Sequence, residues 1–343
     1  KNLAGNRKPG LMTASKKQYN GILTIAHGGK KSLMANIRTI TPKCMMDAKH
    51  NAAQVTEKTK ILVTGATGQL GFDVLKELKA RGIACNGVSS SDFDLTNREA
   101  VLSSISNFAP TAVIHCAAYT AVDKAEDERE RCFAVNVEGT AYVAEACGLL
   151  DIPVMYISSD YVFSGEGDQP FETDSARSPN GYYGLTKSLG EDRIRAAGKK
   201  HFIVRISWVF GINGNNFVCT MLRLGKERDE IRVVNDQIGS PTYTADLATI
   251  LCDLILTEKF GTYHATNEGF CSWFDFAGSI MREAGLNCRV LPITSEEYPQ
   301  KARRPQNSRL SKRSLDKAGL PRLPPWEDAL TRFISQLREK GEI

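Results

Sequence analysis

The sequence predicts an α/β fold: a Rossmann-type doubly wound parallel sheet with a smaller C-terminal substrate-binding lobe. Short apolar or β-branched runs alternate with amphipathic runs of helical period. The first apolar run, Ile61–Thr64, is followed at once by three spaced glycines and a helical pattern. A later strand, Val154–Ser158, ends in a cluster of hydroxyl and carboxyl side chains, at the edge where open parallel sheets bind their ligands.

The size and composition are those of a globular protein. The chain has 343 residues, of which 42% are hydrophobic and 24% are charged. No apolar run approaches 18 residues, so no membrane partner is expected. The nine cysteines are scattered and contain no C-x-x-C pair. They predict reduced core cysteines in a cytoplasmic protein, with no metal site.

The charge of the chain changes near residue 60. Residues 1–60 hold 12 Lys and Arg against 2 Asp and Glu, whereas the remainder holds 32 against 37. Because residues 1–59 also lack a sustained apolar period, we predict a basic, disordered tail there. A targeting peptide or a nucleic-acid-binding arm are the alternatives for this tail. The mildly acidic remainder carries no charge pattern typical of a nucleic-acid partner.

The first predicted strand, loop and helix have the pattern of a dinucleotide site. Gly65, Gly68 and Gly71 separate the strand Ile61–Thr64 from a helix over Leu70–Arg81. Glycines at such positions permit a tight turn, close approach of the pyrophosphate, and close contact between helix and strand. The N–H groups at the start of the helix face the phosphates. The predicted cofactor contacts in this loop are Gly65, Thr67, Gly68, Gln69, Leu70 and Gly71.

The end of the second predicted strand, Ile83–Val88, bears on the choice of cofactor. An acid at this place would hold the adenosine ribose of NAD, and an Arg would hold the 2′-phosphate of NADP. The chain has Ser89, Ser90 and Ser91 instead. We therefore expect either NADPH or NADH to serve.

The next segments bring small and polar residues to the same edge. A helix is expected over Arg98–Phe108, and a third strand over Ala112–Cys116 is followed by Ala117 and Ala118, small enough for a cofactor to lie against the backbone. One long helix is expected from about Asp127 to Leu150. It contains Asn136, a poor residue for a helix interior.

One tyrosine stands out by its spacing. Tyr183 lies near the start of a helix expected to run to about Ala197, and Lys187 is one turn further on the same face. None of the other nine tyrosines has a Lys four residues later. Behind a glycine loop and a strand that ends in Ser158 and Ser159, this spacing favours a catalytic pair.

These motifs resemble one family. The G-x-x-G-x-x-G spacing of TGATGQLG is similar to the extended branch of the short-chain dehydrogenase/reductase superfamily. The chain from Lys60 to Ile343 resembles the bacterial dTDP-4-dehydrorhamnose reductases in HCAAYTAVDKAE, YISSDYVFSG, YYGLTK, VRISWVFG, NDQIGSPTYTADLA and RRPQNSRL. Ser159 departs from the usual Thr of the family but keeps the hydroxyl.

The resemblance implies hydride transfer to the C4 ketone of dTDP-4-dehydro-β-L-rhamnose, for cell-surface polysaccharide. It implies that Tyr183 donates the proton, that Lys187 lowers the pKa of that phenol and binds the nicotinamide ribose, and that Ser159 orients the ketone. Further implied cofactor contacts are Asp94, Leu95, Ala117, Ala118 and Tyr119. Asp94 could equally cap a turn. The implied substrate contacts are Thr120, Val122, Asp160, Tyr161, Trp208, Asn216, Arg304 and Asn307.

The remaining segments are assigned to the substrate lobe. We expect the cofactor core mainly in 60–211 and 241–265, and the lobe mainly in 212–240 and 266–343. Asn215–Phe217 should begin a helix that ends at Arg228, the stretch NDQIGSPT should form a polar loop, and Pro324–Glu339 should form a closing amphipathic helix. Arg303 and Arg304 suit a diphosphate, or are a solvated surface pair. Trp208 lines the sugar pocket or is a buried core aromatic.

Two other functions stay open beside the reductase. One is a non-catalytic NADP-binding regulatory subunit, since the methionine adenosyltransferase beta subunit resembles this family. The other is an epimerase, dehydratase or reductase that acts on another 4-keto-6-deoxy nucleotide sugar. The partner expected in each enzymatic case is a dTDP-sugar or a related molecule. A homodimer is also left open.

Overall fold

The parallel sheet and its cover of helices are confirmed by the computed structural model, which describes residues 59–343. The predicted tail lies outside the described residues. Six strands form one parallel sheet in the order β10-β5-β4-β3-β1-β2. Their bounds are β1 Lys60–Thr64, β2 Ala84–Val88, β3 Ala112–His115, β4 Val154–Ser159, β5 His201–Ile206 and β10 Gly261–His264.

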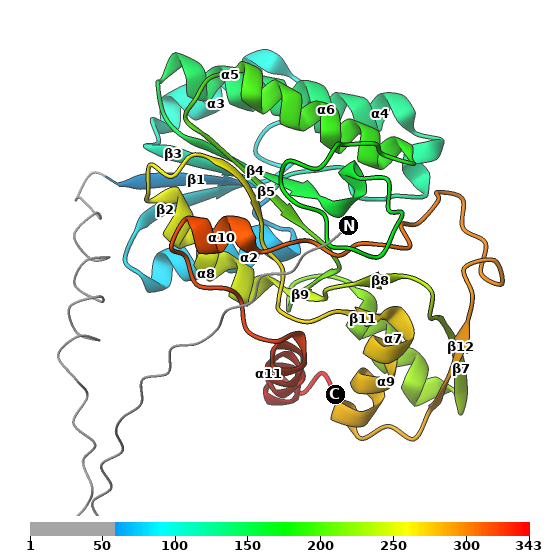
Figure 1. The fold of residues 1–343 in the computed structure, drawn as a ribbon. Helices are drawn as coiled ribbons and strands as arrows, with labels where there is room; N and C mark the ends of the chain where they lie inside the picture. Colours follow the sequence, from blue (N-terminus) through cyan, green and yellow to red (C-terminus); the bar gives the residue numbers. More distant parts are fainter. Residues whose placement is uncertain (1–58) are drawn as a thin grey trace, which may run out of the picture. The chain divides into compact units, whose positions relative to one another are not determined.

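Helices cover both faces of this sheet (Figure 1). On one face lie α2 (Gln69–Ala80) and α8 (Thr244–Ile255), whose apolar side chains share a core with β1, β4 and β5. On the other face lie α3 (Arg98–Phe108), α5 (Thr140–Leu149) and α6 (Tyr182–Ala196). The inner strands β1 and β3 are buried on both sides, which explains their continuous apolar sequences, whereas the edge strand β2 is partly exposed.

The long helix expected between β3 and β4 is confirmed as one continuous helical run, Arg129–Leu149, but its middle turn is π-helical, which was not expected. The structure has a short α4 (Arg129–Phe133), a π-helical segment η3 (Ala134–Gly139) and then α5. The segment turns Asn136 inward, where the residue is 1% exposed. Gly139 lies against Leu95, since a Cβ here would meet the Leu95 side chain at 2.6 Å. π-Helical turns inside α-helices often mark functional positions.

The C-terminal lobe has its own core, built mainly from aromatic and long apolar side chains. It contains α7 (Phe217–Glu227), α9 (Trp273–Ala284) and α11 (Trp326–Glu339), with β7 (Glu230–Val234) paired in parallel with β12 (Arg289–Ile293). The side chain of Asn216 accepts a hydrogen bond from the Cys219 N–H at 3.0 Å and so caps α7, as expected.

Two expectations for this lobe need correction. The stretch NDQIGSPT is not a polar loop, because it forms β8 (Ile238–Gly239) and leads into β9 (Thr242–Tyr243), with Ser240 and Thr242 fully buried. β8 pairs with β11 (Cys271–Ser272), and β9 pairs with β6 (Val209–Phe210). The short helix α10 (Arg313–Lys317) also differs from the expected division, because its Leu315 packs into the sheet core and not into the lobe core.

Candidate active site

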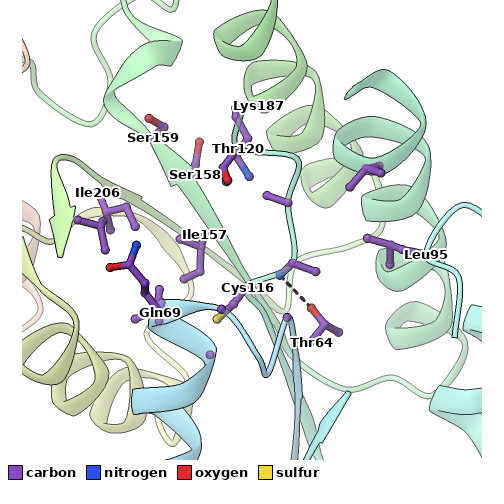
Figure 2. A pocket seen from close by; sticks show the side chains of 18 of the residues that line it. Thr64, Gln69, Leu95, Cys116, Thr120, Ile157, Ser158, Ser159, Lys187 and Ile206 are labelled. Atoms are coloured by element: carbon purple, nitrogen blue, oxygen red, sulfur yellow. Dashed lines mark hydrogen bonds between the residues drawn. The ribbon is translucent and has the colours of Figure 1, made fainter. Parts of the chain in front are cut away.

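A cavity of about 930 Å³ opens at the carboxyl ends of β1, β3 and β4. Figure 2 shows Ser158, Ser159, Thr120 and Lys187 on one side of it, with Gln69 and Ile206 on the other. Most of the predicted site residues meet here. The predicted residues that line the cavity are Gly65, Thr67, Gly68, Gln69, Leu70, Gly71, Asp94, Leu95, Ala117, Ala118, Thr120, Val122, Ser159, Asp160, Tyr161, Tyr183, Lys187 and Trp208.

The glycine loop forms the floor of this cavity at the start of α2. Gly65 has φ +68°, and a Cβ there would lie 2.7 Å from the Ala117 nitrogen. Thr64 Oγ1 accepts a hydrogen bond from that same nitrogen at 3.2 Å, which ties β1 to the residues after β3 (Figure 2). Gly68 is the N-cap of α2 and has no side chain to occupy the first N–H groups. The floor therefore fits a pyrophosphate, because bare backbone and a helix N-terminus face the space.

The end of β2 holds a carboxylate that the expectation for Ser89–Ser91 did not include. Asp92 Oδ2 accepts hydrogen bonds from the Ser89 N–H at 2.6 Å and from Ser89 Oγ at 2.8 Å. These bonds lower the pKa of Asp92, so the negative charge is retained beside the serines. Asp92 is not among the residues that line the cavity, so the expectation for Ser89–Ser91 stays a prediction.

Asp94 caps a turn and also lines the cavity, so both predicted roles are compatible. Its Oδ1 accepts hydrogen bonds from the Thr96 N–H at 2.9 Å and from Thr96 Oγ1 at 2.8 Å. Tyr119, in contrast, is absent from the residues that line the cavity. Its backbone is held by Asn136, and its ring lies 6.0 Å from the Arg131 guanidinium.

Asn136 organises the loop between β3 and α4. Its Oδ1 accepts from the Tyr119 N–H at 2.8 Å, and its Nδ2 donates to the Tyr119 carbonyl at 3.1 Å and to Thr186 Oγ1 at 3.1 Å. Thr186 lies directly before Lys187 on α6. A merely exposed asparagine is thereby excluded, since the side chain links the cavity loop to the helix that carries the tyrosine and lysine.

Tyr183 and Lys187 reach the cavity because α6 packs unusually close to β4. A Cβ on Gly184 would clash with the Tyr161 carbonyl oxygen, and a Cβ on Gly190 would clash with the Tyr156 hydroxyl. The two glycines therefore let α6 approach the end of β4, where Ser159 is the last residue. The Tyr183 ring packs edge-on against Tyr161 with centroids 5.5 Å apart.

The electrostatics differ from the expected effect of Lys187 on Tyr183. Desolvation of the hydroxyl, followed by the charge of Asp160, raises the pKa of Tyr183, and a hydrogen bond with Ser159 opposes this. Burial lowers the pKa of Lys187 to about 7 and raises the pKa of Asp160 to about 6. The expectation that Lys187 holds the pKa of Tyr183 low is wrong for this structure, because burial outweighs it. Tyr183 is a protonated phenol here, the form that can donate a proton.

A second cavity of about 410 Å³ adjoins the first and shares Tyr161 and Trp208 with it. Trp208 has φ +49° and stacks on Trp273 with ring centroids 3.6 Å apart. It is half-buried and lines both cavities, so it is not an ordinary core aromatic. Sequence reasoning missed most of this cavity, whose walls include Phe217, Thr220, Met221, Arg228, Arg232, Gln237, Trp273, Tyr298 and Gln300.

Arg304 is brought to the second cavity, whereas Arg303 is not. Arg304 Nη2 donates to Asp123 at 2.6 Å, and its buried Nη1 has no hydrogen-bond partner among residues 59–343. Arg303 is exposed and lies 3.6 Å from Glu166. The alternative of a solvated surface residue therefore fits Arg303 alone.

Two predicted substrate contacts need correction, because Asn216 and Asn307 line neither cavity. Asn216 caps α7, and its Nδ2 donates to Gln69 Oε1 at 3.2 Å and to the Gly211 carbonyl at 2.9 Å. Asn307 is 2% exposed, and its Nδ2 donates to the Gln169 carbonyl at 2.9 Å. Both amides are occupied by contacts that stabilise loops.

Metal-binding, disulfide-forming and membrane-spanning residues would have distinct patterns in the part of the chain that the structure describes. No group of three or more His, Cys, Asp or Glu side chains there could hold a metal ion. The cysteines from Cys85 onward are free thiols. No helix over residues 59–343 is long and apolar enough to cross a membrane.

The chain was compared with known proteins. Residues 59–339 match the family described as RmlD substrate binding domain. The chain is 41% identical over 278 residues to a spore coat polysaccharide biosynthesis protein, SpsK, of Bacillus subtilis, covering 81% of this chain and 98% of that protein. It is 36% identical over 292 residues to a dTDP-4-dehydrorhamnose reductase of Escherichia coli, covering 81% and 97%.

Solved structures show the same similarity. A dTDP-4-dehydrorhamnose reductase from Bacillus anthracis in complex with NADP is 42% identical, with a TM-score of 0.80, and the match covers 81% of this chain and 99% of that one. A UDP-glucose 4-epimerase from Thermus thermophilus in complex with NAD has a TM-score of 0.71 at 19% identity over 82% of this chain and 99% of that one. The second likeness concerns the fold alone.

Proposed function

The chain belongs to the dTDP-4-dehydrorhamnose reductase family, and from this premise we propose that it reduces the C4 ketone of dTDP-4-dehydro-β-L-rhamnose to dTDP-L-rhamnose with NADPH or NADH. One observation carries the proposal. A protonated tyrosine, a strand-end serine and a buried lysine share a cavity with a glycine floor that fits a dinucleotide. This set suits carbonyl reduction, and a regulatory subunit would not require it.

The cofactor would lie on the backbone of Gly65, Gly68 and Gly71, with its ribose near Lys187. When bound, it supplies the hydride for C4 of the sugar. The ketone oxygen gains negative charge as the hydride arrives, and Tyr183 donates its phenolic proton to that oxygen. Ser159 orients the ketone through a hydrogen bond. The Lys187 ammonium stabilises the phenolate left on Tyr183 and supplies a donor to the ribose.

The second cavity supports a nucleotide diphosphate substrate. Arg304 offers a buried Nη1 without a partner among the described residues, and guanidinium forks match phosphate oxygens. The stacked Trp208 and Trp273 provide an aromatic wall next to it. Tyr161 and Trp208 border both cavities, so we assign the deoxysugar to the space between them, with Thr120, Val122 and Asp160 on the side of the cofactor.

The proposal is tested with purified protein and dTDP-4-dehydro-β-L-rhamnose made in the same reaction by upstream enzymes. Oxidation of NADPH or NADH should be seen at 340 nm only when both the protein and the keto sugar are present, with dTDP-L-rhamnose as the product by chromatography. Cofactor oxidation with a UDP- or GDP-linked 4-keto sugar but not with the dTDP-linked one would reject the proposed substrate.

Cofactor selectivity gives a separate prediction. Because Ser89–Ser91 neither repel nor grip a 2′-phosphate strongly, both cofactors should serve, with kcat/KM values within about a hundredfold, roughly 2.7 kcal/mol. The charge of Asp92 beside them should disfavour NADPH modestly. Asp92→Asn should therefore raise the ratio of NADPH to NADH kcat/KM about two- to fivefold, as expected for one solvent-screened charge. An unchanged ratio would show that the 2′-phosphate does not approach this carboxylate.

The proposal also covers the oligomeric state, the cellular location and the parts of the chain that bind cofactor and substrate. The free thiols fit a cytoplasmic protein, and a homodimer stays a proposal. We propose that residues 60–211 and 241–265 hold the cofactor and that 212–240 and 266–343 hold the substrate, α10 excepted because it packs on the sheet. Light scattering after gel filtration gives the mass of the protein in solution and so tests the homodimer.

A further inference from the structure

A buried carboxylate, Glu191, lies one helical turn after Lys187 on α6. It has no solvent exposure, and Arg205 grips both of its oxygens at 2.7 and 2.8 Å. Arg195 adds a third contact at 2.9 Å. Burial of a carboxylate is costly, so its retention requires such complete pairing. These contacts fix the position of the helix turn that directly follows Lys187.

The same carboxylate reaches the strand that carries Ser159. Ser158 Oγ donates to Glu191 Oε1 at 2.7 Å, and Ser158 lines the cavity directly before Ser159. Arg205 lies opposite Ser158 in the pairing of β4 with β5 and is 1% exposed. It also donates to the Thr173 carbonyl at 3.0 Å, in the loop that precedes α6. One charged group thus links β4, β5 and α6 behind the catalytic residues.

Lys187 lacks a close anionic partner of its own. It is 2% exposed, and within residues 59–343 its Nζ makes neither a hydrogen bond nor an ion pair. Its Nζ lies over the Tyr156 ring, 4.1 Å from the centroid. Glu191, four residues away, is the strongest influence that favours the charged lysine. A buried ammonium in such surroundings depends on this carboxylate to stay protonated.

We propose that Glu191 is a positioning residue for the reduction: its carboxylate holds the Lys187 turn against the strand end that carries Ser159, and its negative charge keeps Lys187 in the ammonium form. The inference rests on the proposed function for its catalytic meaning. The claim that Glu191 controls the charge and position of Lys187 does not depend on the sugar substrate. It can therefore be tested separately, by measuring cofactor binding.

The groups around Lys187 and Glu191 determine how loss of the Glu191 charge would change the pKa of Lys187. Lys187 is faced by His115 and Cys116 at the end of β3, by Cys132 of α4 and by Tyr156 of β4. His115 is buried and neutral, with its pKa lowered to about 3, and burial raises the pKa of Cys116 to about 12. Neither therefore supplies a charge near neutral pH. Glu191 itself is faced by Arg177, Arg195, Arg205, Tyr156 and His264.

Glu191→Gln tests the charge while it keeps the shape of the side chain. The pKa of Lys187 is about 7, so kcat/KM should fall as pH rises through that region. Without the carboxylate, this alkaline limb should move to lower pH by about one unit. Relative to the wild type, the variant should then keep about half of the activity at pH 6 and about a tenth at pH 8. The NADPH dissociation constant should rise over the same interval, because the ribose contact weakens.

Two further variants separate position from charge. Ser158→Ala removes the link to β4 but no charge, and should lower kcat at all pH values without moving the alkaline limb. Asp192→Asn is the matched control, since Asp192 is the next residue, is about half exposed, and also pairs with Arg177 and Arg195. It should leave both profiles unchanged. If Glu191→Gln does not fold, Glu191→Gln/Arg205→Met replaces it, because Arg205 is then not left as a buried guanidinium without its carboxylate.

The outcomes are distinct. A shift of the limb in the Glu191 variant but not in Asp192→Asn supports the inference. An unshifted limb with a uniform loss of activity, or an equal shift in Asp192→Asn, overturns it. If the wild-type protein does not turn over the dTDP-sugar, the proposed function fails, and the pH dependence of NADPH binding alone decides whether Glu191 controls Lys187.

Discussion

Replacing Tyr183 with phenylalanine should lower turnover at least a hundredfold. The change keeps the ring that packs against Tyr161 but removes the phenolic proton, and general acid catalysis is typically worth about 10²–10⁴ in rate. The affinity for NADPH should change little, because the proposed ribose contact comes from Lys187. Steady-state kinetics and fluorescence titration with NADPH measure the two quantities on the same preparation.

The neighbouring tyrosine provides a matched control. Tyr182 begins the same helix but lines neither cavity, and its ring lies 5.0 Å from the Arg129 guanidinium. Tyr182→Phe should therefore keep nearly all of the wild-type turnover. A Tyr183→Phe protein with more than about a tenth of wild-type turnover would show that another group supplies the proton.

Gly71→Ala should abolish tight cofactor binding. A Cβ at this position would clash with the carbonyl oxygen and carbon of Gly65. These are backbone atoms, so they cannot rotate away as a side chain could. Relief of the clash must move either the glycine loop or the start of α2. We expect a cost of about 1–3 kcal/mol in the free energy of unfolding. We also expect at least a tenfold rise in the NADPH dissociation constant, about 1.4 kcal/mol, because the loop would no longer fit the pyrophosphate.

Gly278→Ala is the corresponding control. Gly278 lies within α9, and a Cβ there would meet no atom within 4 Å. Alanine is the better residue in a helix interior, so this variant should be more stable by about 0.5–1 kcal/mol. Denaturation curves should therefore show a loss of stability in Gly71→Ala and a gain in Gly278→Ala. NADPH titrations should show weaker binding in Gly71→Ala only. Unchanged NADPH affinity in Gly71→Ala would mean that the cofactor does not lie on this loop.

The parts of the fold that follow from local sequence were predicted well. The strands β1 and β4 and the helices α2, α3 and α11 have bounds within a few residues of those expected. Each is a short buried run or an amphipathic segment, and its period or flanking glycines are visible without its neighbours. The pairing of Tyr183 with Lys187 was predicted for the same reason, since both lie on one helix.

The errors arise where distant residues decide the local structure. Asn136 lies inward in a π-helical segment and bonds Tyr119 and Thr186, which no local pattern reveals. In NDQIGSPT, the polar residues Gln237, Ser240 and Thr242 are buried, and the stretch pairs with β11 and β6 through Ile238, Gly239 and Thr242. The second cavity gathers side chains from α7, β7, α9 and the loop around residue 300, so its walls could be listed only from the structure.

The central claim is that this chain transfers a hydride from the nicotinamide to C4 of the keto sugar. NADPH carrying deuterium at both C4 positions of the nicotinamide tests it most directly. The account predicts dTDP-L-rhamnose that is one mass unit heavier, with the deuterium at C4 of the sugar by NMR. Product without deuterium at C4, or oxidation of the labelled cofactor with no labelled sugar, would contradict it.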